Sequence, residues 1–204
     1  LGGNANINGA YNTSNPENPL VDFDLGLSKM SFAETFKHIE AVQKFAPIFE
    51  SVIGTYSMDF KLNTKLGATS AETLQALTAK GLLSTNEVKL EGNKALSSLG
   101  KALKTDKLDN ISTKDLNLPF SIENGELATQ PFNFSFGDGG NMSLEGVTKL
   151  DQTIDYKGTI KLPSSLENKY INKVPLKIKG TFTDPKVEVD MKAAATDALG
   201  SIVG

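Results

Sequence analysis

The feature that most constrains this fold is residues 116–162, a stretch of four runs in which apolar and polar side chains alternate. Successive side chains on a β-strand point to opposite faces, so each run predicts a strand with one apolar and one polar face. Asn124-Gly125 and the segment 137–140 (GDGG) separate the runs, and they tolerate the positive φ of tight hairpins. The stretch therefore predicts an antiparallel meander of four strands. Pro131 lacks a backbone N–H and predicts a bulge inside it.

The apolar face of this meander is the candidate functional surface. Its members are Phe120, Ile122, Phe132, Phe134, Phe136, Leu144, Ile154, Tyr156 and Ile160. Two interpretations stay open. The face is an ordinary core, because one-sided sheets bury their apolar face; or it is a partly uncovered trough for acyl chains, in which each buried methylene contributes about 0.8 kcal/mol. Phe134 lies mid-strand and is expected in the core, with any lipid exposure nearer the sheet ends.

The rest of the chain predicts more strands and two helices. Alternation predicts strands within 5–9, 20–27, 58–64, 78–90, 174–182 and 187–191. The capping-box pattern of residues 31–34 (SFAE) begins a broad apolar helix expected over Phe32–Ile53, which Pro47 kinks or restarts and Gly54 ends. Ala95–Leu103 predicts a second, weaker amphipathic helix.

These elements predict an α+β fold. We expect a long, twisted or curled antiparallel sheet of about eight to ten strands, because sheets of that size curl or split into layers. The two amphipathic helices pack on its apolar face. Residues 1–204 contain no sharp linker and are expected to form a single domain.

Composition excludes several classes of function. All 21 cationic residues are lysine and the net charge is −3, so the chain has neither the basic bias of nucleic-acid binding nor an arginine clamp for phosphate. No cysteine is present, which removes disulfides, thiol nucleophiles and thiolate metal sites. No run of about 18 apolar residues could span a bilayer. We expect no nucleic-acid partner and no cofactor.

The polar candidates all have simpler explanations. His38 is the only histidine, and metal sites usually need two or more nitrogen or sulfur ligands. Asp22, Asp24 and Asp59 alternate on strands, and an outward polar face explains that spacing without acid–base chemistry. The glycines of residues 137–140 lie between two strands, so a hairpin explains them better than a phosphate loop does. The sequence therefore predicts no catalytic or metal site and no enzyme.

Short segments, taken in order over roughly positions 5–190, resemble the C-terminal region of the AsmA family of bacterial envelope proteins. The matching segments are residues 12–16 (NTSNP), 45–48 (FAPI) with Gly54, 80–84 (KGLLS), 120–125 (FSIENG) with Phe132, Gly146 with 149–151 (KLD) and 154–156 (IDY), 173–176 (KVPL), 180–181 (GT) and 184–187 (DPKV). No single motif is specific, but their order is. No catalytic motif defines this family.

The resemblance implies a location and a role. AsmA-like proteins are typically anchored in the inner membrane by an N-terminal helix, with the body in the periplasm, and they are similar to groove-forming lipid-transfer proteins. This chain is then expected to be a periplasmic fragment of a longer envelope protein whose anchor lies outside it. The implied function is outer-membrane biogenesis or envelope lipid homeostasis, with phospholipid or another envelope lipid as partner. The alternative is an assembly scaffold that acts through protein–protein contacts and binds no lipid.

Overall fold

The computed structural model describes residues 1–137, 139–162 and 173–192 of the 204-residue chain. The strands are β1 (Asn4–Asn12), β2 (Leu20–Ser31), β3 (Val52–Lys65), β4 (Thr78–Ser84), β5 (Glu87–Glu91), β6 (Asn110–Lys114), β7 (Asn117–Glu123), β8 (Glu126–Phe136), β9 (Gly140–Lys149), β10 (Thr153–Lys161), β11 (Val174–Thr181) and β12 (Pro185–Val189). The helices are α1 (Phe32–His38), α2 (Glu40–Phe45), the 3₁₀ helix η1 (Pro47–Ser51), α3 (Ser70–Ala76) and α4 (Lys94–Leu103).

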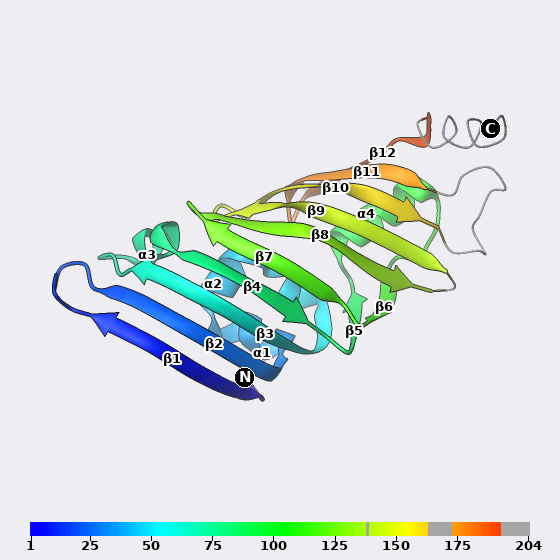
Figure 1. Ribbon diagram of the computed structural model, residues 1–204. Coiled ribbons are helices and arrows are strands. Elements are labelled where there is room, and N and C mark those ends of the chain that lie inside the picture. The colour runs from blue at the N-terminus through cyan, green and yellow to red at the C-terminus, as the bar shows by residue number, and fades with distance from the viewer. Residues whose placement is uncertain (138, 163–172, 193–204) are drawn as a thin grey trace, which may run out of the picture.

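The strands of the described residues form one twelve-stranded antiparallel sheet, which confirms the α+β prediction (Figure 1). Ten strands follow the order β1-β2-β3-β4-β7-β8-β9-β10-β11-β12, and β5 and β6 form a branch. The branch arises because the long strand β3 pairs with β2 and β4 along its later part and with β5 at Val52–Gly54. The sequence pattern predicted one strand near 78–90, where the structure has β4 and β5 joined by a short turn.

The central meander, β7 to β10, has the predicted connectivity. Asn124 and Gly125 both have positive φ, 53° and 74°, as a two-residue hairpin between β7 and β8 requires. The β8–β9 register shifts between Thr129 and Phe132, on either side of Pro131. Proline cannot donate to the ladder, so the chain places it at this irregularity.

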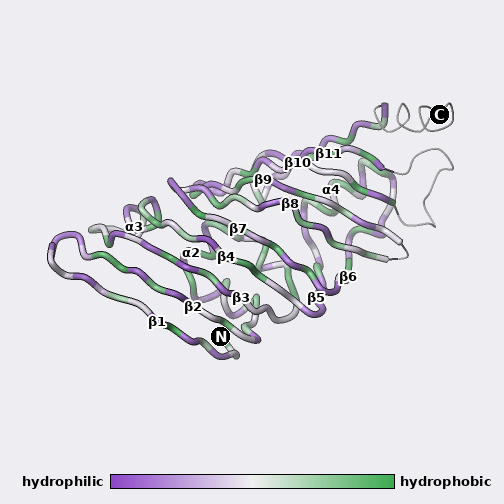
Figure 2. The backbone as a smooth tube through the Cα atoms, viewed as in Figure 1, coloured by the Kyte–Doolittle hydropathy of each residue, from purple (hydrophilic) through white to green (hydrophobic). Residues whose placement is uncertain are grey.

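A continuous row of directly opposed residues crosses the ten strands on the apolar face. In sheet order the row contains Ile7, Leu25, Phe60, Gly81, Phe120, Thr129, Gly146, Tyr156, Ile178 and Val187. We call it the apolar row. Two of its glycines lie beneath aromatic rings: a Cβ on Gly81 would approach Phe60 to 2.4 Å, and one on Gly146 would approach Tyr156 to 2.6 Å. Hydrophobic and hydrophilic positions alternate along the strands throughout the sheet (Figure 2).

The predicted long helix over Phe32–Ile53 is wrong. The segment forms α1, α2 and η1 instead, with extended backbone at Ile39 and a break at Ala46 before Pro47. Val52 and Ile53 are β-branched and start β3, and Gly54 continues that strand at φ 140° rather than ending a helix. The apolar stripe that the sequence pattern assigned to one helix therefore contains residues of two kinds: those of the helices, and the first residues of strand β3.

Two helical covers lie on the same side of the sheet, behind it in Figure 1. The first cover, α1, α2 and η1, packs through the aromatic trio Phe32, Phe49 and Tyr56, whose ring centroids are 4.7–5.4 Å apart. The second cover, α4, buries Leu96 and Leu99 against the later strands. Helix α3 is a short capped turn: Thr69 and Glu72 form a complete capping box, which the sequence analysis did not identify.

Candidate functional site

An apolar cavity of about 440 Å³ lies between the sheet and the two covers. Strands β3, β4 and β7 to β10 form its floor, and side chains of α1, α2, η1 and α4 reach it from the covers. No charged side chain is among the described residues that line it. The polar side chains on its wall are Asn93, Thr113, Thr129, Thr148 and Tyr156. The interior of this fold is therefore not completely filled, and the unfilled space is almost entirely hydrocarbon-lined.

Seven of the nine residues of the predicted stripe line this cavity: Phe120, Ile122, Phe132, Phe134, Leu144, Ile154 and Tyr156. The other two, Phe136 and Ile160, lie in the core at 3% and 0% exposure and do not line it. The stripe thus contains both cavity-lining and fully buried positions, and the trough for acyl chains stays a prediction. Most of the stripe faces the cavity, and its end beneath α4 is core.

Phe134 was predicted to be core, and the structure places it on the cavity wall. It is half-buried, with ring centroids 6.3 Å from Phe132 and 6.2 Å from Phe136. All three side chains share one face of β8: Phe136 is buried within the core cluster that contains Leu96 and Leu99, and Phe134 packs against that cluster while it lines the cavity. A two-residue period places the side chains on one face and does not say which of them a helix covers.

Three of the hydroxyl groups on the cavity wall form hydrogen bonds with other protein groups. Thr148 Oγ1 and the Tyr156 hydroxyl are 3.1 Å apart, and Thr129 Oγ1 donates to the Gly146 carbonyl at 3.3 Å. The Thr148, Tyr156 and Thr129 hydroxyls therefore each have a hydrogen-bond partner within the protein. Burial raises the pKa of Tyr156, partly offset by these bonds, so the phenol is neutral at physiological pH.

One buried hydroxyl has no such arrangement. Thr113 Oγ1 on β6, in a residue only 2% exposed, is without a hydrogen-bond partner, as is Thr85 Oγ1 outside the cavity. Thr113 lines the cavity, but its oxygen is shielded from a water-sized probe. The wall therefore offers a ligand methyl and methylene groups rather than free hydrogen-bond donors.

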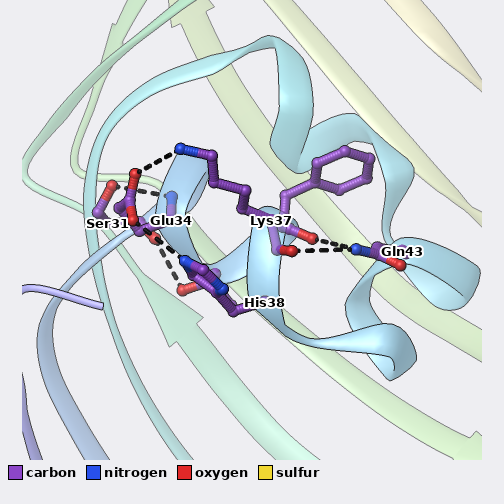
Figure 3. A network of polar contacts seen from close by, with 7 residues as sticks. Ser31, Glu34, Lys37, His38 and Gln43 are labelled. Atoms are coloured by element: carbon purple, nitrogen blue, oxygen red, sulfur yellow. Dashed lines mark hydrogen bonds and ion pairs between the residues drawn. The ribbon is translucent and has the colours of Figure 1, made fainter.

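The first cover reaches across the cavity to the meander through helix α2. Gln152, in the turn between β9 and β10, donates from Nε2 to the Gln43 carbonyl at 3.1 Å. Gln43 in turn donates to the carbonyls of Phe36 and Lys37 at 2.8 and 3.4 Å, which holds α2 against the end of α1 (Figure 3). The cavity-lining residues Ile39, Ala41 and Val42 belong to this segment. One side-chain hydrogen bond thus connects this part of the cover to the opposite wall.

The polar candidates of the sequence lie away from the cavity. His38 is exposed, and its Nε2 is 3.5 Å from a Glu34 carboxylate oxygen, while Lys37 Nζ is 3.6 Å from the other oxygen (Figure 3). The Glu34 amide donates to the Ser31 hydroxyl at 3.3 Å, the first half of the predicted capping box; its carboxylate contacts Lys37 and His38. Asp24 pairs on the outer face with Lys61 at 3.3 Å. Among the described residues no group of three or more His, Cys, Asp or Glu could hold a metal ion.

Most of the cavity wall was not predicted from the sequence: seven of its 36 described residues belong to the predicted stripe. Met58, Phe60 and Leu62 of β3, Leu83 of β4 and the first cover were not assigned to the site. The signal was present, because β3 alternates in the same way as the meander, but the β3–β4–β7 register that joins them is long-range. The sequence predicts an irregular or helical connection over 164–172 and a short helix over 193–203, and both segments lie outside the residues that the structure describes.

No family model, curated protein or solved structure matches the chain. Among the described helices, none combines the length and the hydropathy needed to cross a membrane.

Proposed function

We propose that this chain is a non-enzymatic, periplasmic lipid-binding module, AsmA-like in its role, that holds acyl chains in the cavity and serves outer-membrane biogenesis or envelope lipid homeostasis. The observation that carries the proposal is the cavity itself, a space of about 440 Å³ with an uncharged, hydrocarbon-covered wall. The resemblance to AsmA-like proteins is the basis for the proposed cellular role, and the apolar wall of the cavity is the basis for the proposed ligand class.

The energetics of such a space favour hydrocarbon over water. Cavities of roughly 300–1,000 Å³ are typical ligand pockets. A buried water needs two to four polar partners, and a wall whose hydroxyls are hydrogen-bonded within the protein or shielded offers few of them, so the cavity favours an apolar molecule over water. Each methylene moved from water into the cavity contributes about 0.8 kcal/mol. A lipid tail therefore gains from entering, and its polar head stays outside.

The same wall argues against alternatives. A catalytic site needs a positioned acid, base or nucleophile at the bound substrate, and the described lining residues provide only paired or shielded hydroxyls. An assembly scaffold without lipid binding is the second candidate, but a scaffold has no need of an internal cavity.

The proposal is tested by filling the cavity. Ala79 on β4 lies on the cavity wall, opposite Leu62 and Ile122, so Ala79→Phe places a ring in the space that the acyl chain would occupy. Ala128 on β8 is the matched control, since it is also a half-buried strand alanine but pairs with Ser121 and Val147 and does not line the cavity. The measurements are native mass spectrometry of protein purified gently from bacterial membranes and titration with a fluorescent fatty acid.

Wild type and Ala128→Phe are expected to carry phospholipid near one to one and to bind the probe, while Ala79→Phe binds at least about tenfold more weakly, the equivalent of two lost methylenes. Equal binding by both variants, or a clean apo mass with no probe binding by wild type, would favour the scaffold instead.

A further inference from the structure

Within the part of the chain that the structure describes, strand β1 forms one edge of the sheet. Among the described residues it pairs only with β2, and all nine of its residues are exposed. Its sequence, NANINGAYN, contains no charge and no proline, and its register with β2 runs unbroken from Asn4 to Asn12. Natural sheets usually protect such edges with lysine, proline, bulges or a covering segment, because the free N–H and C=O groups pair readily with another strand. An edge with none of these features is suited to accept one.

The apolar face reaches this edge without a cover. Ile7 opposes Leu25, which opposes Phe60 on the cavity wall, so the apolar row runs from the cavity out to β1. Exposure increases along it: Phe60 and Leu25 are half-buried and Ile7 is 57% exposed. Tyr11, also 57% exposed, lies on the same face of β1. The edge thus combines unpaired backbone with exposed apolar side chains on one side.

We propose that β1 pairs antiparallel with β1 of a second copy of this chain, about a two-fold axis at Asn8. In this register residues i and 16 − i are opposed: Asn4 with Asn12, Ala5 with Tyr11, Asn6 with Ala10, Ile7 with Gly9, and Asn8 with itself.

The strand is complementary to itself in this register. On the apolar face the two large side chains, Ile7 and Tyr11, each meet a small one, Gly9 or Ala5. On the polar face asparagine meets asparagine or alanine, and no like charges oppose each other. An isologous pair needs this self-complementarity, because every contact occurs twice.

The symmetry also fixes where the apolar faces point. Directly opposed residues of antiparallel strands share one face, so the apolar sides of both copies face the same way. The two apolar faces then become continuous across the shared edge, with the two apolar rows offset there by two residues. The pairing itself does not depend on the proposed function; only the meaning of the joined face, a longer path for acyl chains, rests on that proposal.

The test is a charge swap at the two-fold axis. Asn8 is exposed, so Asn8→Lys or Asn8→Glu leaves the fold intact but places like charges directly opposite each other. Sedimentation velocity over a concentration series at low ionic strength, without lipid, is expected to show a wild-type dimer and at least about tenfold weaker association for each variant. An equimolar mixture of the two variants restores the dimer. Asn133→Lys, on an exposed position of β8, is the control and stays dimeric.

Three results would overturn the proposal: a wild-type monomer at all concentrations, dimerisation unaffected by either variant, or a mixture that stays monomeric. Fluorescent fatty-acid binding by the monomeric Asn8→Lys protein is measured separately, so loss of the dimer and loss of lipid binding are distinguished.

Discussion

Two parts of one sheet face differ in how completely they are buried. Where α4 packs, the core is closed: Leu99 of the helix, Leu108 after it and the strand residues Ile160 and Val174 are all 0% exposed. Around the cavity, the strand residues Phe132, Phe134 and Leu144 are only half-buried. The strands alternate in the same way in both parts, so the difference comes from the helices that cover them.

The covers themselves explain the difference. Helix α4 is ten residues long, with an Asn93 side-chain cap at its start and Lys104 in a left-handed cap at its end. Its Gly100 lies where a Cβ would be 2.6 Å from the Thr105 carbonyl, so the chain turns closely back. The first cover is broken at Ile39 and Ala46, and neither break has a side-chain cap. Of the described residues that line the cavity, eight belong to the first cover and two, Ala95 and Leu96, to α4, so the broken cover borders more of the unfilled space than the continuous amphipathic helix does.

The largest expected effect comes from two phenylalanines two residues apart on β8. Phe136→Ser removes a buried ring from the core and is expected to lower the free energy of unfolding by about 3 kcal/mol or more, through lost transfer energy and a new cavity. Phe134→Ser changes a side chain that already borders empty space, so we expect about 1 kcal/mol.

Lipid affinity should follow the reverse order. Phe134→Ser is expected to weaken fluorescent fatty-acid binding several-fold, because the bound chain loses an apolar wall, while the folded fraction of Phe136→Ser binds normally. Urea midpoints and lipid titrations on both variants make the measurement. Equal stability losses would show that the two parts of the face are energetically the same.

A smaller effect concerns pH. Burial raises the pKa of Tyr156 above 10.0, and burial also raises that of Tyr56 beneath the first cover. In the unfolded chain the phenols ionise near their ordinary pKa. The stability that comes from keeping the two buried phenols neutral is therefore fully present below pH 10 and is lost as the pH rises through the folded pKa values. Tyr156→Phe is expected to cost about 1 kcal/mol at neutral pH and to make the alkaline loss shallower.

Urea midpoints between about pH 8 and pH 11 measure this slope. An alkaline slope that is identical in wild type and Tyr156→Phe would mean that the cavity wall is more hydrated than the structure indicates.

The smallest effect on stability compares how the two covers are attached. Gln152→Ala removes the hydrogen bond to the Gln43 carbonyl and is expected to cost less than about 1 kcal/mol, but to speed amide exchange in residues 39–46. Lys94→Ala removes the corresponding bond of α4, from Lys94 Nζ to the Thr183 carbonyl at 3.1 Å, and should leave exchange in α4 unchanged. Leu96 and Leu99 hold that helix by burial. Equal exchange changes in both covers would contradict the comparison.

The sequence by itself determined the local structure. Period-two alternation identified the central meander, Asn124-Gly125 its hairpin and Pro131 its bulge, because each depends on neighbouring residues alone. The nine-residue stripe was on one face for the same reason, since a strand fixes which side its residues take. The amphipathic pattern of Ala95–Leu103 likewise gave α4 to within one residue at its start.

Only the tertiary structure decided which part of that face is filled. The start of β3 within the segment Phe32–Ile53 involves Val52 pairing with Leu90 of β5, a contact 38 positions along the chain. Phe134 and Phe136 are indistinguishable by period, yet Phe136 is buried inside the core cluster, whereas Phe134 packs against that cluster and lines the cavity. Side-chain direction is a local property of the backbone, whereas burial depends on segments that are brought together only when the chain folds.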